Sequence, residues 1–266
     1  MASSLEPSLS LFNLHFFAGT QKQFTSFLKK HLTGKGPLLT VCTPNPEQIV
    51  QAREDSHFSK ALQTTDICIP DGIGIVRASQ IFKLLGKTRE TLAERITGVA
   101  IVKELLLSGV PVLIIGGRAY SSHHVANPQN IPLFHLRIPL DGVRDDDQPW
   151  YWMEGYQQKK TPTQTEEKYI LTALQLVKPQ VVCVAFGAPF QEQWLAAHRR
   201  ELENAEVSVG ICVGGAFDFL TGRVARAPQL IQSIGLEWLF RLWKEPWRWK
   251  RQLRLFKFIR IVLSSL

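Results

Sequence analysis

The sequence predicts an α/β protein with a mostly parallel sheet that is covered by helices on both faces. Two apolar, β-branched runs, at 181–186 and 207–213, end at small residues where polar groups gather, as buried parallel strands do beside a ligand. Strand-like and helical segments also alternate along most of the chain. We therefore expect one domain at 1–240, followed by a basic C-terminal helical appendage at 241–266.

The composition is that of a globular protein with one substantial core. The chain has 266 residues, of which 45% are hydrophobic, and a mean hydropathy of −0.03. It contains no apolar run of about eighteen residues, and its first ten residues lack the pattern of a secretory signal. Four widely separated cysteines in apolar runs are expected to be reduced core thiols, which favours a cytoplasmic location. They are Cys42, Cys68, Cys183 and Cys212.

Hydrophobic periodicity and turn residues predict the elements in chain order. Strands are expected at 9–17, 38–42, 65–69, 111–115 and 134–139, and helices at 21–32, 73–84, 98–107 and 166–177, with a polar loop at 141–163. Thr43 or Asn45 is expected to cap a helix that has proline in its first turn. The apolar residues expected to face inward from the helix at 73–84 are Ile73, Val76, Ile81 and Leu84.

The C-terminal segment carries most of the net charge. The formal net charge is +8, and residues 241–266 contain eight Lys or Arg residues against one acidic residue. A helix is expected from Pro246, with Lys250, Arg254 and Lys257 on one side. Its other side would carry Trp249, Phe256, Ile259 and Leu263. Such a helix either lies at a membrane–water interface or packs on the core with a solvated basic face.

Several polar residues follow the predicted strands. Asp71 ends the strand at 65–69 and could act as a general base, although an Asp at this point more often caps the next helix. Thr43 and Asn45 lie at the same edge and could bind a sugar or base, or simply cap. Gly187 and Gly215 let the backbone approach a ligand closely.

Two further groups could bind an anion. Gln191 and Glu192 begin a helix, where free N–H groups favour an anion, although Glu192 could merely complement the helix dipole. Clustered guanidinium groups would favour a diphosphate. Arg241, Arg248 and Arg251 share one helix face if the helix is continuous, whereas Arg226 alone is typical of a solvated side chain.

Familiar cofactor and metal motifs are missing from the sequence. Neither the dinucleotide-binding nor the P-loop glycine pattern is present. The acidic run at 145–147 has no preceding apolar strand and is interpreted as a solvated turn. His123 and His124 lack a third ligand at metal spacing and are expected to be a surface pair. We expect no metal site and no cofactor.

Taken together, an ordered set of motifs resembles the WecG/TagA/CpsF family of bacterial glycosyltransferases. The resemblance extends from about residue 38 to residue 251. Phe190 stands where the family commonly has Lys, which removes one charge. The motifs are Thr43-Pro44-Asn45, Pro70-Asp71-Gly72-Ile73-Gly74, Glu94-Arg95-Ile96-Thr97-Gly98, Gly187-Ala188-Pro189-Phe190-Gln191-Glu192, Gly214-Gly215-Ala216-Phe217-Asp218, Arg226-Ala227-Pro228, Gly235-Leu236-Glu237-Trp238-Leu239-Phe240-Arg241 and Glu245-Pro246 with Arg248 and Arg251.

This resemblance implies a Rossmann-like fold and inverting transfer of a sugar from a UDP-sugar to a polyprenyl-diphosphate-linked saccharide. It implies that Asp71 is the base with Thr43 beside it, and that the C-terminal arginines Arg241, Arg248 and Arg251 close over the diphosphate at the membrane. The residues that it implies for the nucleotide-sugar pocket are Asn45, Gln191 and Asp218. Arg95, Gly187, Glu192, Gly215 and Arg226 complete the predicted substrate-binding set.

The resulting hypothesis is a peripheral enzyme on the inner face of the cytoplasmic membrane that transfers N-acetylmannosamine or its uronic acid. Its partners would be the UDP-sugar, the lipid-linked acceptor and anionic lipid, without nucleic acid, and a homo-oligomer stays open. One alternative is a UDP-glucose-dependent glucosyltransferase of exopolysaccharide assembly. Another is a non-catalytic protein whose basic tail binds nucleic acid or lipid.

Overall fold

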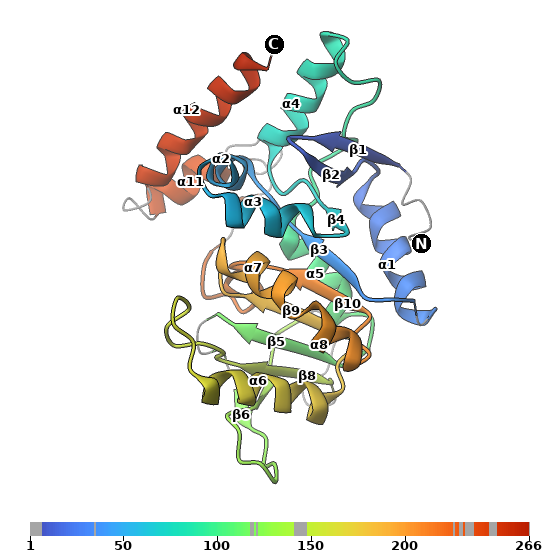
Figure 1. Ribbon diagram of the computed structural model, residues 1–266, viewed down its shortest axis with the longest axis vertical. Coiled ribbons are helices and arrows are strands. Elements are labelled where there is room, and N and C mark those ends of the chain that lie inside the picture. The colour runs from blue at the N-terminus through green and yellow to red at the C-terminus, as the bar shows by residue number, and fades with distance from the viewer. Residues whose placement is uncertain are drawn as a thin grey trace.

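A ten-stranded sheet runs through the centre of the described part of the chain (Figure 1). The computed structural model describes residues 7–34, 36–117, 120, 122–140, 148–225, 227–228, 231, 237–244 and 249–265. The strands are β1 (Ser8–Leu11), β2 (Leu14–Phe17), β3 (Leu39–Cys42), β4 (Ile67–Cys68), β5 (Val112–Gly116), β6 (Ser122–His124), β7 (Phe134–Leu136), β8 (Trp150–Met153), β9 (Val181–Ala185) and β10 (Val209–Cys212). Their spatial order is β1-β2-β4-β3-β10-β9-β5-β8-β7-β6.

The seven strands from β2 to β8 in this order are parallel, and antiparallel strands flank them at both edges. The helices are α1 (Gln21–Thr33), α2 (Pro46–Glu54), α3 (Ser56–Gln63), α4 (Ile73–Leu84), α5 (Gly98–Leu106), α6 (Gln164–Val177), α7 (Phe190–Ala197), α8 (Arg199–Asn204), α9 (Ala216–Leu220), α11 (Glu237–Lys244) and α12 (Trp249–Ser264). This architecture confirms the predicted fold class.

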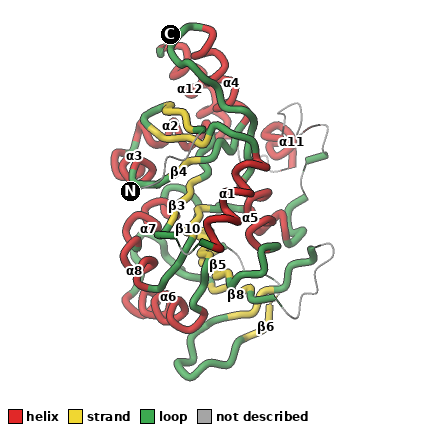
Figure 2. Tube along the Cα trace, turned by 90° about the vertical axis from the view of Figure 1, so that its right-hand side faces the viewer, coloured by secondary structure: helices red, strands yellow, loops and turns green. Residues whose placement is uncertain are grey.

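Alternation along each parallel strand builds two core layers. Cys42, Leu113 and Val184 belong to one hydrophobic cluster, while their strand neighbours Val41 and Ile114 belong to the other. In Figure 2 the sheet is seen nearly edge-on, with α3, α6, α7 and α8 on one side and α1 and α5 on the other. Burial on both faces explains why these strands are continuous apolar runs. All four cysteines are buried and free, as expected.

The helix starts follow the cap residues in the sequence. Asn45 is the N-cap of α2, with Pro46 as its first residue, and its side chain accepts a hydrogen bond from the Gln48 N–H at 3.0 Å. The Gln48 side chain in turn accepts one from the Asn45 N–H, also at 3.0 Å. This capping box fixes the loop between β3 and α2, which contains Thr43 and Asn45.

Three local predictions were wrong. The segment at 9–17 is a hairpin of β1 and β2, because Phe12 and Asn13 take left-handed φ values of 53° and 61°. The predicted loop at 141–163 contains β8, in which Trp150 and Trp152 are buried. The aromatic run of β8 is short and is flanked by polar residues, so the sequence pattern did not indicate a strand there. The acidic run at 145–147 lies outside the described residues.

The third correction concerns α4. Val76 is buried as predicted, but Ile81 and Leu84 are exposed, and Ile75 and Phe82 supply the core face instead. Figure 1 gives the reason, because α4 extends beyond the sheet beside α12. In the outer turns only the side that carries Phe82 is covered, where its ring centroid lies 5.9 Å from that of Phe12 in the β1–β2 turn.

The C-terminal helix α12 has properties of both alternatives. Phe258 and Val262 are buried, and α12 packs against α2. Phe256, Ile259 and Leu263 are exposed. The basic face is not simply solvated as the packed-core alternative assumed: Arg254 donates a hydrogen bond to Gln51 and Lys257 forms an ion pair with Glu54. The predicted domain boundary after residue 240 falls inside α11, and this division stays a prediction.

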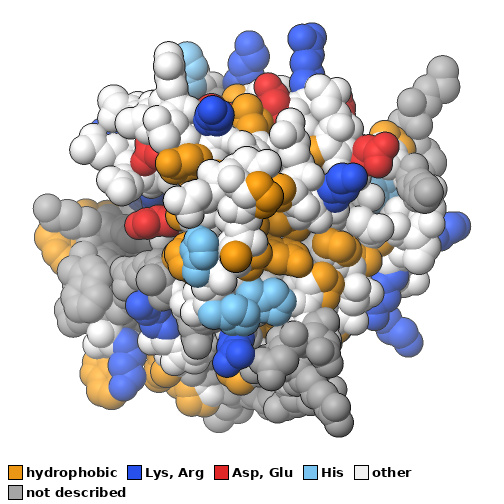
Figure 3. Space-filling view, turned by 90° about the horizontal axis from the view of Figure 1, so that it is seen from below, with side chains coloured by type: hydrophobic (Ala, Val, Ile, Leu, Met, Phe, Trp, Pro, Cys, Tyr) orange, Lys and Arg blue, Asp and Glu red, His pale blue; other side chains and the backbone are white. Residues whose placement is uncertain are grey.

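The opposite end of the molecule carries β6 and β7. Histidine side chains gather there beside hydrophobic ones (Figure 3), and His123 stacks on His135 with ring centroids 5.1 Å apart. His123 and His124 are both exposed, as expected of a surface pair. Among the described residues no three His, Cys, Asp or Glu side chains are grouped so as to hold a metal ion. None of the helices within those residues is both long and apolar enough to span a membrane.

Candidate active site

The loops after β3 and β4 bring Thr43 and Asp71 to the same place. The Asp71 N–H donates to the Pro44 carbonyl at 3.2 Å, which ties the second loop to the first. A Cβ atom built on Gly98 would lie 3.7 Å from Thr43 Oγ1 and 3.8 Å from Asp71 Oδ2. Both oxygens therefore lie next to the start of α5, and a Cβ atom at position 98 would be in ordinary van der Waals contact with them. Carboxyl ends of neighbouring parallel strands are the usual location of a ligand crevice.

Asp71 is not the N-cap of α4. That position is Gly72, which has no side-chain cap, so the common structural explanation for an Asp at this point does not hold. The Asp71 side chain is partly exposed and lines a cavity of about 480 Å³. A carboxylate in such a position can take a proton from a bound hydroxyl group.

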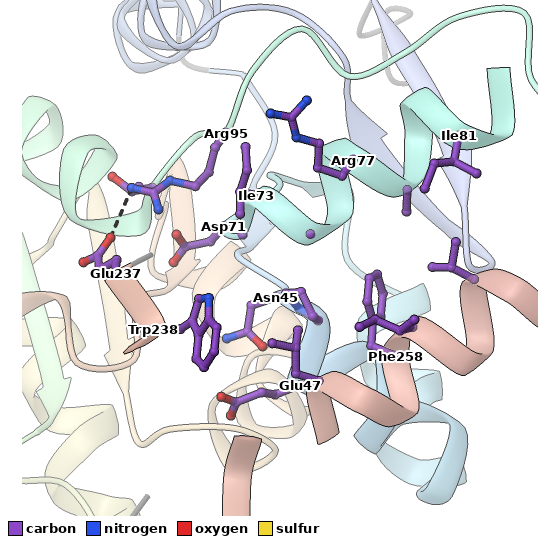
Figure 4. Close-up of a pocket in the computed structure, with 18 of the residues that line it drawn as sticks. Asn45, Glu47, Asp71, Ile73, Arg77, Ile81, Arg95, Glu237, Trp238 and Phe258 are labelled. Atoms are coloured by element: carbon purple, nitrogen blue, oxygen red, sulfur yellow. Dashed lines mark ion pairs between the residues drawn. The ribbon is translucent and has the colours of Figure 1, made fainter. Parts of the chain in front are cut away.

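The cavity joins three of the predicted site residues. Asp71, Asn45 and Arg95 line it together, although they come from loops after β4, after β3 and before α5. Figure 4 shows Asp71 beside Arg95 and Glu237, with Asn45 farther along the cavity. The Asn45 Oδ1 atom is used in the cap of α2, so the amide NH₂ is the end that remains for a ligand.

Arg95 is held by an ion pair with Glu237. Its Nη2 atom lies 3.2 Å from Glu237 Oε2, and both side chains are less than one-fifth exposed. Glu237 begins α11, and the next residue, Trp238, also lines the cavity. The pair therefore connects the loop before α5 to α11 and lies at one end of the cavity (Figure 4).

Gln191 and Glu192 lie behind the cavity instead of on its wall. They are 2% and 1% exposed, and neither lines the cavity. The Gln191 Oε1 atom accepts hydrogen bonds from the Gly187 N–H at 3.1 Å and the Gly214 N–H at 3.0 Å. Gln191 therefore joins the ends of β9 and β10, and the φ values of 76° and 52° at these two glycines require the absence of a side chain.

Glu192 completes a buried polar network that reaches Asn45. Its Oε1 atom accepts from Gln191 Nε2 at 2.8 Å and from Gln48 Nε2 at 3.1 Å. Because Gln48 also forms the capping box with Asn45, the network connects the ends of β3, β9 and β10. Burial raises the pKa of Glu192 to about 7, against the lowering effect of these hydrogen bonds.

Gly215 and Asp218 are adjacent at the start of α9. A Cβ atom on Gly215 would lie 3.4 Å from Asp218 Oδ2. Asp218 Oδ1 is buried without a hydrogen-bond partner among the described residues. Neither residue lines the cavity around Asp71, but Phe219, the neighbour of Asp218, does. The role of Gly187, Gln191, Gly215 and Asp218 in a nucleotide-sugar pocket stays a prediction.

The predicted arginine cluster cannot be placed. Arg226 and Arg248 lie outside the described residues, and so do the side chains of Arg241 and Arg251. Their roles also stay predictions.

Sequence reasoning missed several residues of the cavity wall. Glu237 and Trp238 belong to a motif that was recognised, but neither was chosen as a site residue. Arg77 lies one helical turn after Ile73, and the stripe at 73, 77 and 81 could have indicated a shared wall. Phe258 and Val262 show the same four-residue spacing in α12.

The fold and cavity define an α/β protein whose ligand site lies at the carboxyl ends of parallel strands. The model of the glycosyl transferase WecG/TagA/CpsF family matches residues 9–266, so the chain belongs to this family of glycosyltransferases and the resemblance is confirmed. A relative from Bacillus subtilis (strain 168), N-acetylglucosaminyldiphosphoundecaprenol N-acetyl-beta-D-mannosaminyltransferase, is 30% identical over 264 residues. The match covers 96% of this chain and 91% of the relative.

Proposed function

We propose that this protein is an inverting glycosyltransferase that transfers N-acetylmannosamine from a UDP-sugar to N-acetylglucosamine carried on polyprenyl diphosphate. The observation that carries the proposal is the Asp71 carboxylate inside a cavity shared with Asn45 and Arg95. The name of the Bacillus relative describes the same transfer to a lipid diphosphate acceptor. Membership of the family supports the reaction class, and the relative supports the choice of sugar.

In the proposed reaction, Asp71 takes the proton of the acceptor hydroxyl as that oxygen attacks the anomeric carbon. The new C–O bond forms on the face opposite the departing UDP, so the configuration inverts. Thr43 lies beside Asp71, and its hydroxyl donates a hydrogen bond to the Cys212 carbonyl at 3.2 Å, which holds the Thr43 side chain in position. We propose that the C-terminal arginines Arg241, Arg248 and Arg251 stabilise the negative charge that develops on the departing UDP.

The donor sugar can be identified with a panel of UDP-sugars. Purified protein and an N-acetylglucosaminyl diphosphate lipid should release UDP with UDP-N-acetylmannosamine and much less with UDP-glucose. Release with UDP-glucose alone would favour the exopolysaccharide glucosyltransferase. Absence of release with every sugar would contradict both assignments.

Replacing Asp71 tests the catalytic step. Asp71→Asn should lower kcat by about 10²–10⁴-fold, because the amide cannot accept the proton, while UDP binding is retained. Asp55→Asn is a matched control, since Asp55 caps α3 outside the cavity and Asn caps equally well. Turnover by Asp71→Asn near the rate of Asp55→Asn would remove Asp71 from the role of base.

We also propose that transfer needs no metal ion, since cationic side chains can balance a diphosphate. The rate of UDP release should then be the same in EDTA as in Mg²⁺. A rate that EDTA abolishes and added Mg²⁺ restores would contradict this part of the proposal.

We place the protein at the inner face of the cytoplasmic membrane as a peripheral protein. The exposed side chains of Phe256, Ile259 and Leu263 on α12 support this location, together with the basic residues of the same segment. Each Lys or Arg near an anionic surface adds about 1 kcal/mol of attraction. An acceptor bound to a lipid would be reached from that surface.

A further inference from the structure

The cavity that contains Asp71 has a second, apolar half between α4 and α12. We call this half the α4–α12 groove. Its walls are formed by Ile73, Ala78 and Ile81 from α4 and by Phe258, Ile259 and Val262 from α12. Figure 4 shows Ile81 and Phe258 at the end of the cavity that is farthest from Arg95 and Glu237.

Contacts within the chain hold the groove at both ends. At the inner end, a Cβ atom on Gly74 would lie 2.8 Å from Pro46 Cγ and 3.6 Å from Phe258 Cε1, so the close approach of α4 to α2 there depends on glycine. At the outer end, the Lys87 ammonium group donates a hydrogen bond to the Ser265 carbonyl. The two walls are therefore fixed relative to each other.

The apolar wall continues from the cavity to the surface. Ile81 is 39% exposed and Ile259 is half exposed, and beyond them Leu84 is 87% exposed. Leu263, at the same end of α12, is also exposed. Apolar side chains that are contiguous with a cavity and left open to solvent mark a binding surface more often than isolated ones do.

The residues that line the cavity along α4 change from acidic to basic to apolar. Asp71 precedes the helix, Arg77 lines the cavity about two turns later, and Ile81 follows one turn beyond, about 6 Å along the axis. A carboxylate, a cation and an apolar wall thus succeed one another. A sugar diphosphate lipid presents the complementary order of hydroxyl, diphosphate and hydrocarbon.

We propose that the α4–α12 groove binds the first isoprenoid units of the acceptor lipid. The inference rests on the proposed function, because the acceptor hydroxyl must reach Asp71 for the chain attached to it to lie in the same cavity. The groove is the apolar part of that cavity, and it opens where Leu84 and Leu263 are exposed. The rest of the chain leaves the protein there and enters the bilayer.

Acceptors of increasing chain length test this directly. The probes are N-acetylglucosaminyl diphosphates of prenols with one, two and three isoprene units, used as monomers without detergent or vesicles. For the unmodified protein, each added unit should lower the acceptor KM at least about fivefold, because each one buries further methylene and methyl groups. The kcat should change little, since the hydrocarbon does not touch the reacting atoms.

Two variants test whether the dependence of the acceptor KM on chain length arises in the α4–α12 groove. Ile81→Glu and Ile259→Glu each place a charge in the groove, and each should bring the ratio of KM between the shortest and longest acceptors close to one. Leu176→Glu is the matched control, because Leu176 on α6 is 38% exposed, much as Ile81 is, but lies outside the cavity. Its KM ratio should equal that of the unmodified protein.

The outcomes separate the two claims. UDP release that does not depend on chain length would overturn the groove assignment and leave the proposed function intact. No release with any acceptor would overturn the proposed function itself. If Ile259→Glu instead converts a dimer to a monomer in sedimentation while the KM ratio is unchanged, the groove is an interface between two copies, and the isoprenoid assignment is wrong.

Discussion

Glu192 is the residue whose environment is least expected of a carboxyl group. One of its oxygens accepts two side-chain hydrogen bonds, while Oε2 is buried without a partner in the described part of the chain. Burial favours the neutral form, which explains the raised pKa of about 7. A neutral carboxyl group can hold Gln48 and Gln191 without placing a bare charge beside the core thiols.

This leads to a prediction about stability and pH. The pKa of Glu192 is higher in the folded protein, at about 7, than the ordinary value of 4.5, so the folded state binds the proton more tightly. The contribution of Glu192 to the stability of the folded protein is therefore greatest below pH 4.5, falls as the pH rises to 7, and is lost above that. Glu192→Gln should remove this loss and raise the free energy of unfolding at pH 8 by up to about 3 kcal/mol.

Urea unfolding of the variant and the unmodified protein between pH 4.5 and 8 measures this difference. Glu90→Gln, at an exposed carboxylate, should show a difference near zero at every pH. A Glu192→Gln protein that is destabilised equally across the range would mean that the carboxyl group is needed for its shape and not for its protonation.

Among the elements, α12 is proposed to serve two functions, one on each of two faces. Phe258 is 3% exposed and its ring centroid lies 5.5 Å from that of Phe12 in the β1–β2 turn. Phe256, two residues earlier, is 68% exposed. One face therefore holds the helix on the molecule, and the other is exposed, which is where the proposed contact with a membrane surface would lie.

Truncating each aromatic ring should separate these functions. Phe258→Ala should lower the free energy of unfolding by about 3–5 kcal/mol, because it leaves a cavity in the core. Phe256→Ala should change it by less than about 0.5 kcal/mol but weaken co-sedimentation with anionic vesicles. Equal loss of stability in both variants would show that Phe256 is packed, and unchanged vesicle binding would remove it from the docking face.

The elements also show where sequence reasoning is reliable. Strands β3, β5, β9 and β10 were predicted because burial on both faces gives uninterrupted apolar runs. Helix periodicity located α1, α5 and α6 to within a few residues. Periodicity did not show that Ile81 lines a groove, because an apolar residue that lines a groove has the same spacing as one in a core.

At the scale of the whole molecule, the sheet order decides which residues meet. Pairing of β3 with both β4 and β10 brings Thr43, Asp71 and Gly214 to one edge, as strand-end reasoning anticipated. That reasoning could not tell which side chains line the cavity and which lie behind it. Gln191 illustrates the limit, because its position in a motif does not reveal that its side chain joins two strand ends.

The cavity walls come from distant parts of the chain. Asp71 and Ile81 belong to the first third, whereas Phe258 and Val262 come from α12, after every strand of the described sheet. During synthesis on the ribosome the sheet can therefore assemble before the cavity exists. A polypeptide interrupted between α9 and α12 would keep its strands and its carboxylate but lack a place to hold the hydrocarbon. Under the proposed assignment, the groove for the lipid would thus be completed only after α12 has been synthesised.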